Sequence, residues 1–216
     1  MTAKVEIDLR KIHHNAATLK KWCEEKGIQV TAVVKGINGD VEIARALVDS
    51  GITSLADTKV ERIAKLKSAQ VPATYMLIRT PALSEVSQVV QHVDVSVQSE
   101  MDVVRAISTE AMKQNKTHAI IVMVEMGDLR EGVMPSDLPS FIEQAMQLPN
   151  IEIVGIGANF ACFGGIIPTD QKMRELSSLV KHIQKQYSLF LPYVSGGNSA
   201  NYYWLKQTKD VGCINH

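Results

Sequence analysis

Apolar residues follow two different spacings in the first part of the chain. Between Leu9 and Lys26 they recur at helical intervals, which predicts an amphipathic helix that Asp8 can cap and Gly27 can end. Just before this helix, Val5–Asp8 is expected to form a short strand. Val30–Val34 places β-branched residues at consecutive positions, a pattern typical of a strand that is buried on both faces. The start of the chain therefore predicts a strand, a helix and a second strand.

The rest of the chain repeats this alternation of helical and strand patterns. We expect helices at 41–50, 60–68, 84–91, 100–114, 138–147 and 170–186. We expect strands at 54–56, 74–78, 93–97, 118–125, 151–160 and 192–194. One helix between successive strands implies right-handed crossovers, and therefore a parallel sheet.

The number of repeats favours a closed barrel over an open sheet. Seven strands counted from Val30 are many for a small open sheet, and no Gly-x-Gly-x-x-Gly motif follows the first long strand. The predicted fold is an α/β, TIM-type (β/α)8 barrel, of which this chain holds about seven βα units. Because such a barrel needs eight strands, Val211–His216 (VGCINH) is expected to begin the last one. We therefore expect residues 1–216 to be one barrel domain, incomplete at its C-terminus, of a longer protein.

Composition and charge narrow the class of partner. A hydrophobic fraction of 45% is ample for a large core, and 23 basic residues balance 23 acidic ones without a long run of like charge. Neither nucleic acid nor a membrane surface is therefore an expected partner, which leaves a small molecule. Cys23, Cys162 and Cys213 lie far apart, which argues against disulfides and against a zinc site. With no apolar segment of signal-peptide or membrane-spanning length, a cytoplasmic location is expected.

Lys35 is the first candidate for chemistry, because it ends the apolar stretch VTAVVKG. The carboxyl ends of parallel strands face the active-site mouth of a barrel, and a lysine partly withdrawn from water there can act as a nucleophile. Burial against the strand would lower its pKa, and Gly36 would leave space beside its amine. The alternative is a lysine that extends its amine into solvent over the strand end. For a single lysine the alternative is the more common role.

Two further segments follow expected strands. Glu125–Gly132 carries Arg130 between glycines, where a guanidinium can bind a carboxylate through two hydrogen bonds. An ordinary ion pair between Arg130 and Asp128 or Glu131 is the alternative. The second segment, Asn159–Gly165, contains Cys162, for which a small buried thiol is the expected role.

The fourth such segment, Ser195-Gly-Gly-Asn-Ser-Ala-Asn201, has the composition of a phosphate-binding loop. Gly196 and Gly197 allow the backbone to approach an anion, while Asn198, Ser199 and the free N–H groups of the next helix supply donors. A glycine turn followed by a helix cap is the alternative. We prefer the phosphate interpretation because barrels often bind phosphate after the seventh strand.

A lysine, a phosphate loop and a carboxylate-binding arginine at one rim together indicate pyridoxal phosphate. Lys35 would hold the aldehyde as a Schiff base, and Ser195–Ser199 would hold the phosphate. Arg130 would bind the substrate carboxylate or the ring's 3'-oxygen.

Five motifs, in order, carry a resemblance to a known family. They are VEIDLRKIHHN, AVVKG, DLREG, GIGANFACFGG and VSGGNSAN. Together they resemble the alanine racemase N-terminal barrel family of pyridoxal-phosphate enzymes, and most of all its alanine/ornithine racemase branch. The resemblance extends over nearly the whole chain.

This resemblance implies roles for individual residues. Lys35 matches the Schiff-base lysine, and Arg130 matches the arginine near the cofactor oxygen and the substrate carboxylate. Asn159 stands where alanine racemases proper have a histidine beside the pyridine ring, and Asn198 with Ser199 matches their phosphate-binding Asn-Ser. The implied activity is racemisation of an amino acid, with Lys35 as one of two proton-transfer bases.

This sequence departs from the family pattern in ways that concern the substrate and the catalytic residues expected outside residues 1–216. The loop GINGD replaces the family's tyrosine-bearing loop, and this change together with Asn159 argues against alanine as the substrate. The resemblance alone implies ornithine or another basic amino acid. The family's pyridine-nitrogen arginine and its catalytic tyrosine, from a C-terminal β domain across a dimer interface, are not among these residues. A homodimer is therefore expected for the full protein. The alternative function is a non-catalytic protein that binds pyridoxal phosphate, as single-barrel relatives do.

Overall fold

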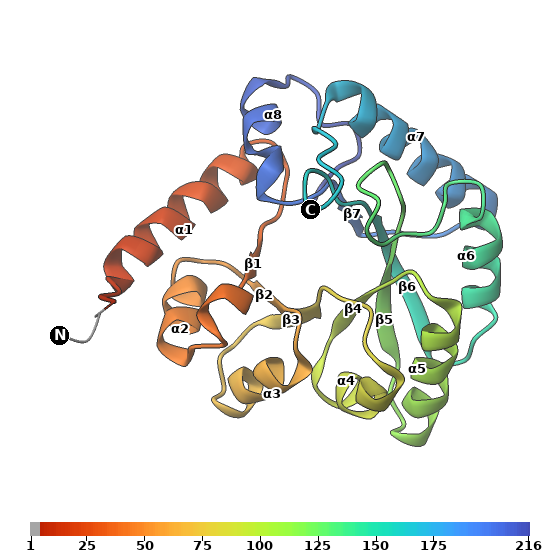
Figure 1. The fold of residues 1–216 in the computed structure, drawn as a ribbon, viewed down its shortest axis with the longest axis horizontal. Coiled ribbons are helices and arrows are strands. Elements are labelled where there is room, and N and C mark those ends of the chain that lie inside the picture. The colour runs from red at the N-terminus through yellow and green to blue at the C-terminus, as the bar shows by residue number, and fades with distance from the viewer. Residues whose placement is uncertain (1–4) are drawn as a thin grey trace.

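The computed structural model describes residues 5–216, and its strands form one curled parallel sheet (Figure 1). The strands are β1 (Thr31–Val33), β2 (Ser54–Asp57), β3 (Thr74–Leu77), β4 (Val95–Gln98), β5 (His118–Met123), β6 (Ile151–Gly157) and β7 (Tyr193–Ser195). They are hydrogen-bonded in sequential order, each parallel to the next. An unreversed strand order is that of a barrel, so the predicted fold class is confirmed.

The helices lie outside the curved sheet and connect its strands (Figure 1). They are α1 (Leu9–Glu24), α2 (Val41–Asp49), α3 (Val60–Ser68), α4 (Val86–His92), α5 (Met101–Lys113), α6 (Leu138–Met146), α7 (Asp170–Tyr187) and α8 (Tyr202–Gln207). Short turns η1 (Lys35–Ile37), η2 (Leu83–Glu85) and η3 (Ser199–Asn201) lie between them. Within residues 5–216, none of these helices combines the length and the apolar character that crossing a membrane requires.

Polar side chains fix where several helices begin. The Asp8 carboxylate accepts a hydrogen bond from the Arg10 N–H at 3.0 Å, and Asp40 accepts one from the Ile43 N–H at 3.0 Å. These bonds satisfy N–H groups that have no partner within the first turn of a helix. The expected strand at Val5–Asp8 is wrong, because these residues pair with no other strand and Asp8 is used as the cap of α1.

The core has two layers, one inside the barrel and one between the sheet and the helices. Along β5, Ile121 and Met123 point into the barrel, while Ile120 and Val122 pack against the helices. Successive side chains of a strand point to opposite faces, so apolar residues at consecutive positions bury both faces of β5. The long apolar run in the sequence of β5 is therefore explained by burial of both faces of this strand.

β1 does not match the pattern expected for it. It pairs only with β2, so it is an edge strand of the described sheet. Val33 is 49% exposed and Thr31 and Ala32 are partly buried, whereas Val34 is buried. The expectation of burial on both faces is wrong here, because β-branched residues indicate a strand but not how many neighbours cover it.

The final residues lie between the two edges of the sheet without forming a regular strand. The Asn215 N–H donates to the Val194 carbonyl at 3.1 Å, and the His216 carbonyl accepts from the Gly196 N–H at 2.9 Å. On the other side, the Gln29 N–H donates to the Asn215 carbonyl at 2.9 Å. Residues 215–216 therefore bond to β7 and to the segment before β1, which is the place of an eighth strand.

A buried histidine lies beneath the helices at the start of β5. The His118 ring Nε2 is 2.8 Å from the Ser96 hydroxyl oxygen, which also accepts a hydrogen bond from the Gln98 amide at 2.8 Å. Burial lowers the pKa of His118 to about 4, with Lys116 adding to the effect and Asp94 opposing it. His118 is therefore neutral in the folded protein at neutral pH.

Protonation of His118 is expected to destabilise the protein in mild acid. The unfolded side chain has a pKa near 6.5 and the folded one a pKa of about 4, so unfolding takes up a proton between these pH values. The stability that depends on neutral His118 is fully present above pH 6.5 and is lost as the pH falls towards 4. The free energy of unfolding should fall by up to about 3 kcal/mol over this range. Urea unfolding from pH 7 to pH 4 should show this loss. His118→Gln should flatten the profile, while the exposed control His182→Gln should not.

Candidate active site

The carboxyl ends of the strands gather the residues that the sequence singled out. Lys35 follows β1, Arg130 follows β5, Asn159 follows β6, and Ser195–Ser199 ends β7 and continues into η3. In a parallel barrel these ends form one rim, so all four segments belong to the same side of the molecule. The contacts join three of them directly and leave Lys35 apart.

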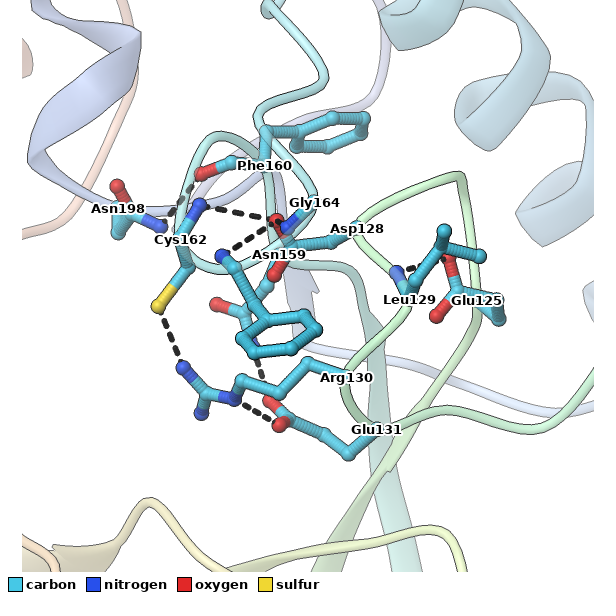
Figure 2. Close-up of polar contacts among 11 residues, drawn as sticks. Glu125, Asp128, Leu129, Arg130, Glu131, Asn159, Phe160, Cys162, Gly164 and Asn198 are labelled. Carbon is cyan, nitrogen blue, oxygen red and sulfur yellow. Dashed lines mark hydrogen bonds and ion pairs between the residues drawn. The ribbon is translucent and has the colours of Figure 1, made fainter.

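Arg130 and Asn159 are joined through a glutamate (Figure 2). The Arg130 Nε forms an ion pair with the Glu131 carboxylate, whose other oxygen accepts a hydrogen bond from the Asn159 amide. Burial opposes the charge on Arg130, but Glu131 and Cys162 outweigh it and raise the pKa of Arg130. The ion pair considered from the sequence is therefore present with Glu131, and it holds the guanidinium beside Asn159.

Cys162 differs from its expected role. Its side chain is exposed, and its Sγ accepts a hydrogen bond from the Arg130 Nη1 (Figure 2). Ala161 adopts a left-handed backbone conformation with φ of 48°, which reverses the chain just before Cys162. The expectation of a buried thiol is wrong because this turn carries the side chain outward, towards Arg130.

Asp128 organises the loop after β6, a role that sequence reasoning missed. Its side chain is buried, and Oδ1 accepts hydrogen bonds from the backbone N–H groups of Cys162, Phe163 and Gly164 at 2.9, 3.0 and 3.2 Å (Figure 2). Burial alone would raise the pKa of Asp128, but these three bonds and the nearby Arg130 lower it. The carboxylate thus ties the loop after β5 to the loop after β6.

Gly164 allows these two loops to approach so closely, and Gly132 allows the loop after β5 to fold back onto the end of that strand. A Cβ added at Gly164 would collide with the Asp128 carbonyl group, and one added at Gly132 would collide with the backbone of Val124 and Glu125. The sequence carries a weak signal for this contact, because Asp128 lies between Gly127 and Gly132 and a second glycine pair occurs at Gly164 and Gly165. Pairing the two segments nevertheless requires the tertiary structure.

The loop after β7 has backbone donors that the protein leaves free. The N–H groups of Gly197, Asn198 and Ser199 donate to no other group within residues 5–216. Gly197 has φ of 134°, a conformation that favours glycine, and a Cβ there would collide with Asn201. Consecutive free N–H groups on a glycine turn suit an anion such as phosphate.

Asn198 links this loop to the others. Its amide nitrogen donates to the Phe160 carbonyl at 2.9 Å (Figure 2). Its oxygen accepts a hydrogen bond from the Ala200 N–H at 2.8 Å. Both ends of the amide therefore hold the backbone. Direct contact between Asn198 and a phosphate stays a prediction, whereas Ser199 makes no side-chain hydrogen bond within the described residues.

Lys35 lies in η1, and its side chain is exposed. Its Nζ makes no hydrogen bond or ion pair within residues 5–216, while its carbonyl accepts a hydrogen bond from Arg62 Nη1 at 3.1 Å. The expected burial of this side chain is wrong, because β1 is an edge strand and covers only one side of the segment. Its amine is therefore exposed to solvent.

Metal-binding side chains do not gather at this rim. Over residues 5–216, no group of three or more histidine, cysteine, aspartate or glutamate side chains is placed to hold a metal ion. The rim instead offers hydrogen-bond donors, among them the amine of Lys35, the guanidinium of Arg130, the Ser199 hydroxyl and the free N–H groups at residues 197–199.

Comparison with known proteins identifies relatives over most of the chain. The family model "Alanine racemase, N-terminal domain" matches residues 7–212. The chain is 37% identical over 204 residues to an ornithine racemase from Acetoanaerobium sticklandii, and 33% identical over 200 residues to a lysine racemase from Thermotoga maritima. These matches cover 94% and 93% of this chain, but only 57% and 56% of the relatives. The chain thus spans little more than half the length of the curated relatives it matches.

Solved structures share the fold at lower sequence identity. An alanine racemase from Clostridium difficile matches with a TM-score of 0.79 and 16% identity, covering 96% of this chain and 54% of that one. PipY from Synechococcus elongatus, solved with PLP (pyridoxal phosphate) bound, matches with a TM-score of 0.76 and 16% identity. That match covers 94% of this chain and 95% of PipY. At these identities the likeness shows the fold alone.

Proposed function

Because this chain belongs to the alanine racemase N-terminal domain family, we propose that it is the pyridoxal-phosphate-binding barrel of an amino-acid racemase. The observation that carries the proposal is the free amine of Lys35 on the same rim as Arg130 and the unpaired N–H groups of residues 197–199. An amine, a guanidinium and a phosphate-binding turn are the groups that this cofactor and an amino-acid substrate require.

The residues present fit the cofactor. Lys35 would hold it covalently through Nζ, while the free N–H groups of residues 197–199 and the Ser199 hydroxyl would bind its phosphate. Asn159, fixed by Glu131, would lie beside the ring. When bound, the cofactor withdraws electrons from the substrate and acidifies its Cα–H bond.

The protein residues would then orient the substrate and move its proton. Arg130 would bind the α-carboxylate or the 3'-oxygen of the cofactor, and the Glu131 ion pair would keep its guanidinium in one orientation. Lys35 Nζ would remove and return the proton on one face of the substrate. A second base must serve the opposite face, because one base cannot deliver a proton to both.

The second base belongs, in this proposal, to a part of the protein outside residues 1–216. His13 and His14 are on α1, and Tyr202 and Tyr203 are on α8, beyond the phosphate loop, so we assign the second base to none of them. The greater length of the ornithine and lysine racemases supports a further domain, which we propose to be of β character. A homodimer would bring this domain to the rim of the partner barrel.

Ornithine or another basic amino acid is the proposed substrate. The identities of 37% and 33% to an ornithine racemase and a lysine racemase support this choice. A second candidate function is a non-catalytic protein that binds pyridoxal phosphate. It is favoured by the likeness to PipY, a chain of about one barrel that was solved with PLP bound.

Loss of optical activity tests the proposal. The full-length protein with added pyridoxal phosphate should abolish the circular dichroism of L-ornithine or L-lysine, and should act more slowly on L-alanine. Residues 1–216 alone should racemise none of the three at a useful rate, because the second base is absent. A full-length protein that binds the cofactor without racemising any of them would support the second candidate function.

Ser199→Ala is expected to weaken cofactor binding. The variant removes one hydrogen bond to a charged phosphate, and such a bond contributes about 1.5–3 kcal/mol, so the Kd should rise about tenfold or more. Absorbance titration with pyridoxal phosphate measures this change. Ser178→Ala, at an exposed site on α7, is the matched control. An unchanged Kd for Ser199→Ala would mean that the loop is an ordinary turn.

A further inference from the structure

The segment that carries Lys35 is held from the neighbouring helix by one arginine. Arg62, on α3, donates a hydrogen bond from Nη1 to the Lys35 carbonyl at 3.1 Å. Its stem also lies against the end of the same segment, since a Cβ added at Gly39 would be 3.1 Å from the Arg62 Cβ. Arg62 therefore contacts both ends of residues 35–39.

Apart from Arg62, this segment is held by hydrogen bonds within its own turn and by Ile37, which packs against the core. It follows an edge strand in which Val33 is 49% exposed, and the Lys35 amine has no partner within residues 5–216. η1 is followed by a reversal in which Asn38 and Gly39 both adopt left-handed conformations, with φ of 54° and 61°. The direction of the lysine side chain therefore depends on how the backbone of this short turn is held.

Arg62 is itself fixed by a buried carboxylate. Asp57, at the end of β2, is fully buried, and its Oδ1 is 3.5 Å from Arg62 Nη1. The same oxygen accepts hydrogen bonds from the N–H groups of Thr58 and Lys59 at 2.6 and 3.0 Å. A buried carboxylate needs a nearby cation, and Arg62 is its ion-pair partner among the described residues.

We propose that Arg62, anchored by Asp57, is a positioning residue that aims Lys35 for covalent attachment of the cofactor. The inference rests on the proposed function. Attachment requires the lysine amine and the phosphate loop to reach the two ends of one rigid molecule at once, so misplacing the amine slows the reaction without weakening the phosphate contacts. Arg62 acts through the Lys35 backbone and touches neither substrate nor cofactor in this proposal.

Two ligands distinguish a misplaced Lys35 amine from a general loss of structure at the cofactor site. The aldehyde of pyridoxal phosphate can condense with the Lys35 amine, forming a carbon–nitrogen double bond in place of the carbon–oxygen bond and releasing one water. Pyridoxine phosphate has the same ring and phosphate but carries an alcohol in place of the aldehyde, so it cannot form this link. In the full-length protein, Arg62→Met should slow the appearance of the adduct absorbance about tenfold or more, as expected for a reacting group moved by about an ångström. The Kd for pyridoxine phosphate should remain unchanged, because none of the hydrogen bonds and ion pairs of Arg62 within residues 5–216 involves the loop after β7.

A second variant covers the case in which the first fails to fold. Arg62 Nη1 makes both contacts, with the Asp57 carboxylate and with the Lys35 carbonyl. Arg62→Lys keeps a cation near Asp57, but its amine is one bond closer to the backbone than Nη1, so it should fold normally and still slow attachment. Lys59→Met, at an exposed site just before α3, is the control and should change neither rate nor affinity. Restoration of the attachment rate in Arg62→Ala by added guanidinium would add support.

The possible failures are distinct. Attachment at the wild-type rate in folded Arg62→Met or Arg62→Lys would overturn the inference, and so would a parallel loss of affinity for pyridoxine phosphate, which indicates a merely structural role. If borohydride fixes no cofactor to Lys35 in the wild-type protein, the proposed function itself fails, and the inference fails with it.

Discussion

Lys35→Ala is expected to abolish covalent binding of pyridoxal phosphate and to reduce racemisation of basic amino acids by roughly 10²–10⁴-fold or more. The substitution removes the amine that would hold the cofactor and would carry the proton on one face of the substrate. Among the described residues, 5–216, the Nζ of Lys35 makes no hydrogen bond or ion pair that would stabilise the fold. The free energy of unfolding should therefore stay close to that of the wild type.

Absorbance and labelling measure this result. The wild-type protein should show the visible absorbance of the covalent adduct, and borohydride followed by peptide mass spectrometry should locate the cofactor on Lys35. Lys59→Ala, which alters an exposed lysine paired with Glu61, should leave both results unchanged. Labelling at a different lysine in the wild-type protein would contradict the assignment of Lys35.

Asp128→Ala is expected to produce the largest loss of stability among these variants. The substitution leaves three backbone N–H groups of the loop after β6 without their acceptor. Losing one hydrogen bond to a charged group costs about 1.5–3 kcal/mol, so we expect a loss of roughly 3 kcal/mol after partial access of water to the loop. Released from Asp128, the loop would also no longer hold Cys162 against Arg130.

Chemical unfolding and amide exchange test the role of Asp128. Urea unfolding gives the free energy, and hydrogen exchange should accelerate at Cys162, Phe163 and Gly164 in particular. Asp128→Asn retains an acceptor oxygen and should cost less than Asp128→Ala. Wild-type exchange rates at these amides in Asp128→Ala would contradict the role assigned to Asp128.

The pH dependence of stability shows how much of the stabilisation by Asp128 comes from its negative charge and how much from its hydrogen-bonding geometry. The pKa of Asp128 is lower in the folded protein than in the unfolded chain, where it is near 3.9. The stabilisation by the charged carboxylate is therefore fully present above about pH 3.9 and is lost as the pH falls through the folded pKa. The difference in stability between the wild type and Asp128→Asn should therefore shrink below about pH 4. The loss due to His118 occurs at higher pH, so the two effects are separable.

Most of the secondary structure could be predicted from the order of apolar residues. The expected helix at 60–68 coincides with α3, and the expected strand at 54–56 lies within β2. Local spacing and caps are sufficient for such elements, because each buries one continuous apolar face against its neighbours. The strand expected at Val5–Asp8 failed because a strand also requires a partner strand, which short-range pattern does not supply.

The candidate site could be predicted only in part. Lys35, Arg130, Asn159 and Ser199 were each singled out because they follow strands, and the parallel sheet gathers them at one rim. Their chemical roles stay predictions. The residues that hold them are of ordinary type and give no local signal, as with Glu131 between Arg130 and Asn159.

By itself, the sequence determined the repeat of strands and helices, the barrel winding and the residues at the strand ends, because these follow from local periodicity and chain connectivity. Only the tertiary structure decided that Lys35 is exposed, that Asp128 binds the loop at residues 162–164, and that Arg62 reaches the Lys35 carbonyl. The last two facts depend on segments about 30 residues apart meeting in space, and the first depends on which segments cover the end of β1. Burial and hydrogen bonding at such places are set by the neighbouring segments.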